Sequence, residues 1–282
     1  MYWEELRKRP EETPFRYAVL DFDGTVSLIR EGWQPIMIRY FTEELARTPQ
    51  GKRENAGKLT EQAREMIFFH TGKQTIYQCI ALAEAVTRMG GVPQPPQAYK
   101  DEYLRRLMRK IDGRLKGLQS GAVDPETLTV PGTYALLGLL ERHGVTPYLA
   151  SGTDEEHVLR EAELLGLTRY FGSHIYGAQR DYKTFSKRMV IQRLIRENNL
   201  AGEALLGFGD GYVEIGNIRE VGGYAVGVAS DEARRQGVDA WKRERLLRAG
   251  ADAIIPDFRQ TDELEGRLFG ATKGESHAVS GI

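Results

Sequence analysis

Hydrophobic and polar residues repeat with two different periods along this chain. From residue 30 to about residue 124, apolar residues recur every three or four positions, the spacing of one buried helix face. Segments rich in glycine or proline divide this stretch at 49–51, 71–72 and 90–96. No strand pattern interrupts it, so the sequence predicts a block of several consecutive helices.

Short apolar runs precede and follow this helical block. We expect strands at 17–20, 145–150, 174–176, 204–208, 224–228 and 253–255. The intervening segments have helical spacing, with helices expected at 134–142, from 153 onward, at 186–198 and at 241–248. Alternating strands and helices predict an α/β fold with a parallel sheet and right-handed crossovers.

The helical block lies between the first strand and the rest of the sheet, so it is an insertion. We expect an α/β core made of residues 1–29 and 129–270, and a helical insertion at 30–128. Asp-Pro at 124–125 and Pro-Gly at 131–132 mark the return to the core. The polar segment 271–282, rich in glycine and serine, is expected to be a disordered tail.

Composition narrows the class of protein. The 282 residues are 41% hydrophobic and 28% charged, and 39 basic against 40 acidic residues give a net charge of −1. No basic field therefore points to nucleic acid or an anionic membrane. The chain has no signal-like start, no apolar run long enough for a membrane span, and one cysteine, Cys79, which we expect to be a buried helical thiol. These features predict a cytoplasmic protein.

Two aspartates end the first strand. Asp21 and Asp23 are separated by one residue, so in an extended segment their side chains point to the same side. Gly24 allows a sharp turn just beyond them. Two carboxylates directed at one point require a cation or a shared proton, and Mg²⁺ is the cation that prefers oxygen ligands.

Two other strand ends carry polar residues, Ser151 and Asp210. In an open parallel sheet, ligands bind beyond the carboxyl ends of the strands. A lysine also opens the helix that precedes the Asp210 strand. Lys187 follows a possible N-cap, Ser186, and is our first choice, while Lys183 in the preceding loop is the alternative.

These pieces together resemble the haloacid dehalogenase-like phosphatase superfamily. The matching segments are D-F-D-G-T-V at 21–26, the serine strand end at 149–153, the helix-opening Lys187, and G-D-G-Y-V-E at 209–214. The resemblance covers roughly residues 15–29 and 129–260. It implies a Rossmann-like core, with the helical insertion as a cap over the site.

The resemblance also implies roles for the acidic residues. Asp21 would attack phosphorus and form an aspartyl-phosphate, and Asp23 would protonate the leaving oxygen and then activate water. Mg²⁺ would be held by the Asp21 carboxylate, the Asp23 main-chain carbonyl and Asp210. Glu214, where aspartate is frequent in the family, would ligate the metal, hold a metal-bound water or pair with the lysine.

The phosphate group would be bound by residues of two turns. Ser151, Gly152 and Thr25 are expected to contact its oxygens, and the ammonium of Lys187 would offset its charge. Ser151 could instead cap the following helix, although Thr153 or Asp154 could do so in its place.

A cap closes over the site and selects the substrate. The polar segment 70–74 between two helices is the expected point of contact, with Lys73 and Gln74 as substrate-binding residues. The basic segment 241–245 is interpreted as a solvated helix face. Four cap aromatics are expected to pack within the cap: Phe68, Phe69, Tyr77 and Tyr103.

We therefore expect a Mg²⁺-dependent phosphomonoesterase acting on a small phosphorylated metabolite, such as a sugar phosphate or phosphoglycolate. A phosphomutase is the nearest alternative, because it differs only in how well the cap excludes water. A non-catalytic binding module is the alternative from another class. The expected partner is the small substrate alone, with no nucleic acid or membrane, and the protein would be a monomer or a homodimer.

Overall fold

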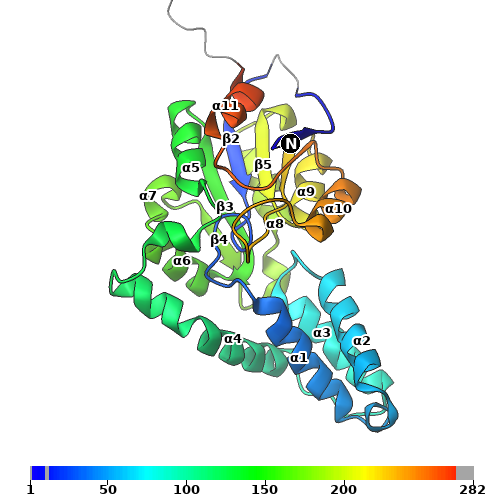
Figure 1. The fold of residues 1–282 in the computed structure, drawn as a ribbon. Helices are drawn as coiled ribbons and strands as arrows, with labels where there is room; N and C mark the ends of the chain where they lie inside the picture. Colours follow the sequence, from blue (N-terminus) through cyan, green and yellow to red (C-terminus); the bar gives the residue numbers. More distant parts are fainter. Residues whose placement is uncertain (1, 10–12, 271–282) are drawn as a thin grey trace, which may run out of the picture.

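A mostly parallel sheet forms the centre of the molecule. The computed structural model describes residues 2–9 and 13–270, so the expected tail at 271–282 lies outside the described residues. The described strands form one sheet in the order β1-β7-β6-β5-β2-β3-β4 (Figure 1). The strands are β1 (Glu4–Glu5), β2 (Tyr17–Leu20), β3 (Thr146–Asp154), β4 (Ile175–Ala178), β5 (Leu205–Gly209), β6 (Tyr224–Val228) and β7 (Ala253–Ile255).

The six strands expected from the sequence are confirmed, and they are parallel to one another. The central strand β2 pairs on both sides, with Tyr17 opposite Thr146 of β3 and Leu205 of β5. β1 was not expected, because it consists of two glutamates without an apolar pattern. It runs antiparallel to β7 and pairs Glu4 with Ile254.

Helices cover both faces of the sheet. Side chains alternate along β2, so Leu20 packs in the cluster that contains α5, α6 and α11, while Val19 packs against α8, α9 and α10. The result is a three-layer core (Figure 1). Its helices are α5 (Thr133–Arg142), α6 (Glu155–Leu164), α7 (Thr168–Phe171), α8 (Lys187–Glu197), α9 (Tyr212–Glu220), α10 (Ala240–Ala249) and α11 (Thr261–Phe269).

The expected helical block is also present. Between β2 and β3 the chain forms α1 (Trp33–Ala46), α2 (Ala56–Phe69), α3 (Thr75–Arg88) and α4 (Pro96–Gln119). Figure 1 shows these helices together at one end of the sheet. Short 3-10 helices lie at Gly51–Arg53, Pro125–Leu128, Tyr182–Thr184 and Gly202–Ala204.

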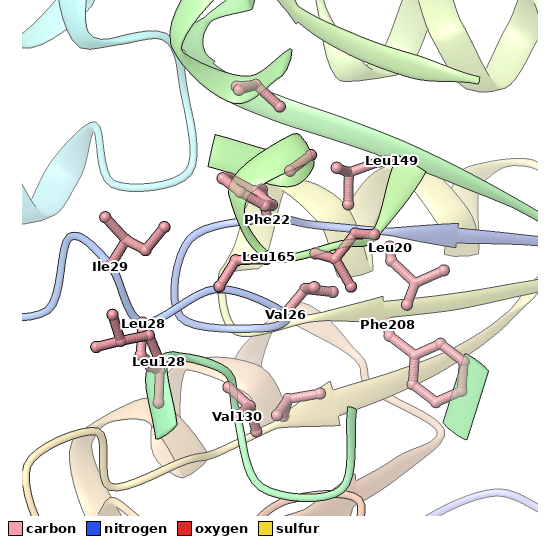
Figure 2. Packing of buried hydrophobic residues seen from close by; sticks show 14 of the residues in the cluster. Leu20, Phe22, Val26, Leu28, Ile29, Leu128, Val130, Leu149, Leu165 and Phe208 are labelled. Atoms are coloured by element: carbon pink, nitrogen blue, oxygen red, sulfur yellow. The ribbon is translucent and has the colours of Figure 1, made fainter. Parts of the chain in front are cut away.

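The segments that lead into and out of the helical block pair with each other. Leu28 N–H donates to the carbonyl of Leu128 at 2.8 Å, and Val130 N–H donates to that of Val26 at 3.0 Å. Their side chains lie in one apolar cluster (Figure 2). Because this cluster continues from the sheet into the helices, the division at residues 30 and 128 stays a prediction.

Three local expectations are corrected or confirmed. The helix expected from Thr153 begins at Glu155, because β3 continues to Asp154 after a register shift. Asp154 occupies the N-cap position without a capping hydrogen bond, and its carboxylate pairs with Lys100 of α4. Cys79 is buried in α3 as expected. The prediction that Phe69 packs inside the cap was wrong, because its side chain is 70% exposed.

No helix among the described residues has both the length and the apolar character to cross a membrane.

Candidate active site

A pocket lies between the carboxyl ends of the central strands and the helical cap. Asp21 follows β2, Gly152 lies in the last part of β3, and Asp210 follows β5, so three adjacent strands bring these residues to one place. Asp23 and Lys187 line the same pocket. The structure therefore brings together residues from all four segments on which the resemblance rests.

The geometry distinguishes the two candidate lysines. Lys187 Nζ lies 2.7 Å from Asp21 Oδ1 and also pairs with Glu214. The hydroxyl of Ser186 accepts a hydrogen bond from Met189 N–H and so caps the helix that begins at Lys187. Lys183 is exposed in a 3-10 turn and does not line the pocket. Lys187 is therefore the lysine that reaches Asp21.

Opposing effects act on this buried ion pair. Burial raises the pKa of Asp21 well above its usual value, Lys187 lowers it, and the carboxylates of Glu214 and Asp210 raise it further. Burial disfavours the charged form of Lys187, but Asp21 and Glu214 outweigh it and raise the pKa of the ammonium. The lysine is protonated at neutral pH, and its single positive charge is shared between the carboxylates of Asp21 and Glu214.

Asp23 is held by hydroxyl groups on one of its oxygens. Its Oδ2 accepts from Thr153 Oγ1 at 2.8 Å and from Ser151 Oγ at 3.3 Å. The other oxygen, Oδ1, is buried without a hydrogen bond and lies 3.8 Å from Arg30 Nε. Burial raises the pKa of Asp23, and Arg30 opposes this increase. A carboxyl group with a raised pKa is suited to hold and transfer a proton.

Two residues expected to contact phosphate, Ser151 and Thr25, are buried and do not line the pocket. Ser151 is buried, donates to Asp23 and accepts from Thr153 N–H at 3.0 Å, so its hydroxyl is already engaged. Thr25 is fully buried, and its Oγ1 has no hydrogen-bond partner. The pocket surface here is formed instead by Gly152 and Thr153. From the sequence, Thr153 is predicted only as a possible helix cap.

Arg30 and Glu161 form a buried ion pair that was not foreseen. Both Arg30 Nε and Nη2 donate to the Glu161 carboxylate, at 3.1 and 2.7 Å. Arg30 lines the pocket next to Asp23, so this pair orients a guanidinium toward the acid. A local signal existed, because Glu161 lies on the apolar face of α6 with Val158 and Ala162.

The interpretation of segment 241–245 as a solvated helix face was wrong. Lys242 is only 5% exposed, and its Nζ lies 2.8 Å from Asp210 Oδ2 and 2.7 Å from Glu232 Oε1. Trp241 and Arg245 of the same helix line the pocket. The available signal was again a charged residue at an apolar position, since Lys242 and Leu246 are the buried residues of α10.

Asp210 lies close to the turn after β2. A Cβ atom on Gly24 would overlap the Asp210 carboxylate, and Gly24 also has a positive φ of 78°. Only glycine permits both the turn and this approach. The carbonyl of Gly24 accepts a hydrogen bond from Ser230, which in turn accepts one from Lys242. Asp210 is thereby fixed against the segment that carries Asp21 and Asp23.

The cap contributes the segment between α2 and α3. Lys73 lines the pocket together with Thr71 and Gly72. Gln74, expected to contact substrate, is buried and faces away from the pocket lining. Its Nε2 donates to the carbonyls of Tyr182 and Phe185, at 2.9 and 2.7 Å. Gln74 thus attaches the cap to the loop before Lys187.

Among the ion-paired groups around the pocket, acids outnumber bases. Two buried oxygens, Asp23 Oδ1 and Glu214 Oε2, have no hydrogen-bond partner. Three basic groups, Arg30, Lys187 and Lys242, pair with the acids of the site. They pair with six acids, which are Asp21, Asp23, Glu161, Asp210, Glu214 and Glu232.

A hard divalent cation fits this donor set. Among the described residues, no three side chains of Asp, Glu, His or Cys are arranged to hold a metal ion between them. Mg²⁺ usually takes only one or two protein carboxylates and keeps several waters. Asp21 and Asp210, with the main-chain carbonyl of Asp23, match that requirement.

The fold and the pocket define a Rossmann-like α/β protein with an acidic site at the carboxyl ends of its strands. A family model described as haloacid dehalogenase-like hydrolase matches residues 15–222, and the chain belongs to this family. The family assignment made from the four sequence segments is confirmed. The search of curated proteins found no match.

Solved structures share this fold at low sequence identity. A predicted phosphoglycolate phosphatase from Haemophilus somnus 129pt has a TM-score of 0.56 at 15% identity, with 90% of this chain and 99% of that chain covered. A β-phosphoglucomutase from Clostridium difficile has a TM-score of 0.57 at 11% identity, covering 90% and 97%. A hydrolase of the same family from Deinococcus radiodurans R1, with bound phosphate and sodium, has a TM-score of 0.52 at 17% identity, covering 91% and 96%.

Proposed function

We propose that this protein is a Mg²⁺-dependent phosphomonoesterase that acts on a small phosphorylated metabolite through an aspartyl-phosphate. The observation that carries the proposal is the contact between Asp21 and Lys187, with Asp23 in the same pocket. A nucleophilic carboxylate, a fixed cation and a second carboxyl group are what two-step phosphoryl transfer requires. The family assignment supports a hydrolase.

The first step would transfer the phosphoryl group to the protein. A carboxylate oxygen of Asp21 forms a bond to phosphorus as the bond from phosphorus to the ester oxygen breaks. Asp23 gives its proton to the departing oxygen, which leaves as an alcohol. The ammonium of Lys187, held by Asp21 and Glu214, offsets the charge of the incoming phosphate. Gly152 and Thr153 border the space for its oxygens.

The second step would release phosphate. Asp23, now ionised, takes a proton from a water molecule as that water attacks phosphorus of the aspartyl-phosphate. The bond between phosphorus and Asp21 breaks, and the free carboxylate is restored. Mg²⁺ bound by Asp21, Asp210 and the Asp23 carbonyl would reduce the repulsion between carboxylate and phosphate.

The size of the pocket favours a small substrate. Its cavity has a volume of about 90 Å³, below the range of roughly 300 to 1,000 Å³ that is common for ligand sites. The cap segment at Lys73 and Gln74 lies directly against Gly152. This supports a compact metabolite such as a sugar phosphate or phosphoglycolate.

The test is phosphate release from a panel of phosphorylated sugars, short acids, amino acids and nucleotides. We expect turnover that needs Mg²⁺, stops with a chelator and is lost in Asp21→Asn. Asp112→Asn, which changes an exposed aspartate of the cap, is the matched control and should retain activity. Turnover that survives in Asp21→Asn would contradict the mechanism, and no turnover on any ester would favour a binding role.

A phosphomutase is the second candidate. The close approach of the cap to Gly152 supports it, because a closed cap excludes the water needed for hydrolysis. Among the structures with this fold is the β-phosphoglucomutase from Clostridium difficile. In a mutase the phosphoryl group of Asp21 passes to a second sugar hydroxyl. Accumulation of a sugar bisphosphate, with little free phosphate, would identify this reaction.

A further inference from the structure

The basic side chains that line the pocket fall into two groups. Arg30, Lys187 and Lys242 each pair with carboxylates of the site. Lys73 and Arg245 also line the pocket, but neither forms an ion pair with an acid within 4 Å in the described parts of the chain. Two cations therefore border the substrate space without an anionic partner.

Arg245 is held in a defined orientation by neutral groups. Its Nη1 donates to the carbonyl of Phe68 at 2.9 Å, at the end of cap helix α2. The guanidinium lies over the rings of Trp241 and Tyr212, 4.5 and 5.4 Å from their centroids. The guanidinium is half-buried, and burial lowers the pKa of Arg245 relative to its usual value. Its position is fixed, and in the described parts of the chain the carboxylates of Asp210 and Glu214 act on its charge only from beyond ion-pair distance.

Lys73 lies at the same end of α2. Its backbone is fixed, because Gln74 anchors the cap to the core and the Lys73 carbonyl packs against Gly152. Its ammonium lies 5.5 Å from the centroid of the Phe69 ring. Tyr212, whose ring lies under Arg245, donates to the carbonyl of Phe69 at 2.9 Å. Both cations line the pocket, Lys73 from the cap segment and Arg245 from α10 of the core.

Neither cation is needed for the reacting phosphate. Lys187 already lies beside Asp21, and buried carboxylate oxygens without a hydrogen-bond partner, on Asp23 and Glu214, favour a further cation there. A substrate with a neutral body would place uncharged groups against Lys73 and Arg245 and leave both without a partner. An anionic group on the substrate would supply that partner through charge-assisted hydrogen bonds.

We propose that the substrate carries a second anionic group, which binds between Lys73 and Arg245 while its phosphoester lies at Asp21. The inference rests on the proposed function and specifies its substrate class as a short phosphorylated molecule with a carboxylate or a second phosphate. The cavity of about 90 Å³ limits the linker between the two anionic groups to a few atoms.

Matched pairs of substrates test this class. Phosphoglycolate and ethyl phosphate differ by a carboxylate in place of a methyl group, and ethane-1,2-diol bisphosphate and 2-hydroxyethyl phosphate differ by one phosphate. In one pair, we expect kcat/KM to be at least tenfold higher for the compound with the second anionic group. The pair that shows this difference identifies the second group as a carboxylate or a phosphate. Equal kcat/KM values within both pairs would overturn the inference.

Substitutions locate the second anionic group. Lys73→Gln and Arg245→Gln should each lower kcat/KM for the preferred anionic substrate about tenfold, mainly through KM, with a smaller loss for its neutral counterpart. Arg245→Lys should recover part of the loss. The controls are Lys183→Gln and Arg248→Gln, which change exposed cations outside the pocket. Equal losses on both members of a pair would mean a structural role and contradict the proposal.

A binding measurement separates this inference from the proposed function. Calorimetry with Asp21→Asn, which does not depend on turnover, should show that phosphoglycolate or the bisphosphate binds at least tenfold more weakly when Lys73→Gln or Arg245→Gln is added. Unchanged binding would overturn the second anionic site. Phosphate release without a preference for the anionic substrate would retain the proposed phosphatase activity and reject only the second anionic site. Binding of the anionic ligand without turnover would retain the second anionic site and reject the phosphatase activity.

Discussion

The ammonium of Lys242 lies 2.8 Å from Oδ2 of Asp210, so a second buried lysine holds a carboxylate of the site. The arrangement parallels that of Lys187, which bridges Asp21 and Glu214. Lys242 likewise bridges Asp210 and Glu232. Each proposed carboxylate ligand of the metal is therefore oriented by an ammonium group.

We expect Lys242→Met to weaken metal binding, because Asp210 loses the group that orients it. Residues that hold a metal ligand in place typically contribute about 10- to 100-fold in affinity. Titration with Mn²⁺, followed by electron paramagnetic resonance, measures this directly. Arg248→Met on the same helix is the control. Unchanged or tighter binding would mean that the lysine only competes with the metal for Asp210.

Glu161→Gln should strongly destabilise the fold. Arg30 and Glu161 are 5% and 1% exposed, and loss of the Glu161 charge leaves the buried guanidinium with only the Asp23 carboxylate, 3.8 Å away, as a counter-charge. Breaking such a pair typically costs about 3–5 kcal/mol. Urea unfolding measures the change in the free energy of unfolding. Glu61→Gln, in an exposed pair with Arg64, should change it by less than about 1 kcal/mol. A similarly small effect at Glu161 would show that Arg30 is hydrated.

Gly152→Ala should impair activity by displacing the cap. The added Cβ would lie 2.7 Å from the carbonyl oxygen of Lys73, a backbone atom, so the segment at 70–74 must move. We expect kcat/KM to fall about tenfold or more, since small displacements from productive geometry are costly. Gly113→Ala in α4 meets no atom within 4 Å and should leave kcat/KM unchanged. Full activity of Gly152→Ala would show that cap and core are not in contact during turnover.

Cys79 should be unreactive in the native protein. The thiol is buried in α3, and burial raises its pKa to about 12, so the reactive thiolate is scarce at pH 8. We expect labelling by a disulfide reagent such as DTNB to be slow in buffer and rapid in denaturant. Rapid labelling of the folded protein would show that the cap opens locally around α3.

Local sequence patterns were sufficient for the strand order along the chain, the helical insertion and the residues at the strand ends. The spacing around Lys187 also favoured it over Lys183, because a helix start has local signals, but the choice was made by the contact with Asp21. The pairs Arg30–Glu161 and Lys242–Asp210 could not be predicted, since each joins residues far apart in the chain. A charged residue at an apolar helix position was visible in the sequence, but its partner depends on the three-dimensional packing.

The central position of β2 also has a consequence for how the protein folds. Its residue Tyr17 pairs with Thr146 and Leu205, so this strand gains its neighbours only from distant parts of the chain. Contacts with such large sequence separation form slowly, whereas the helices of the insertion contact their sequence neighbours. During synthesis, the segment that carries Asp21 can therefore be fully enclosed only after β5 has been synthesised and has paired with β2.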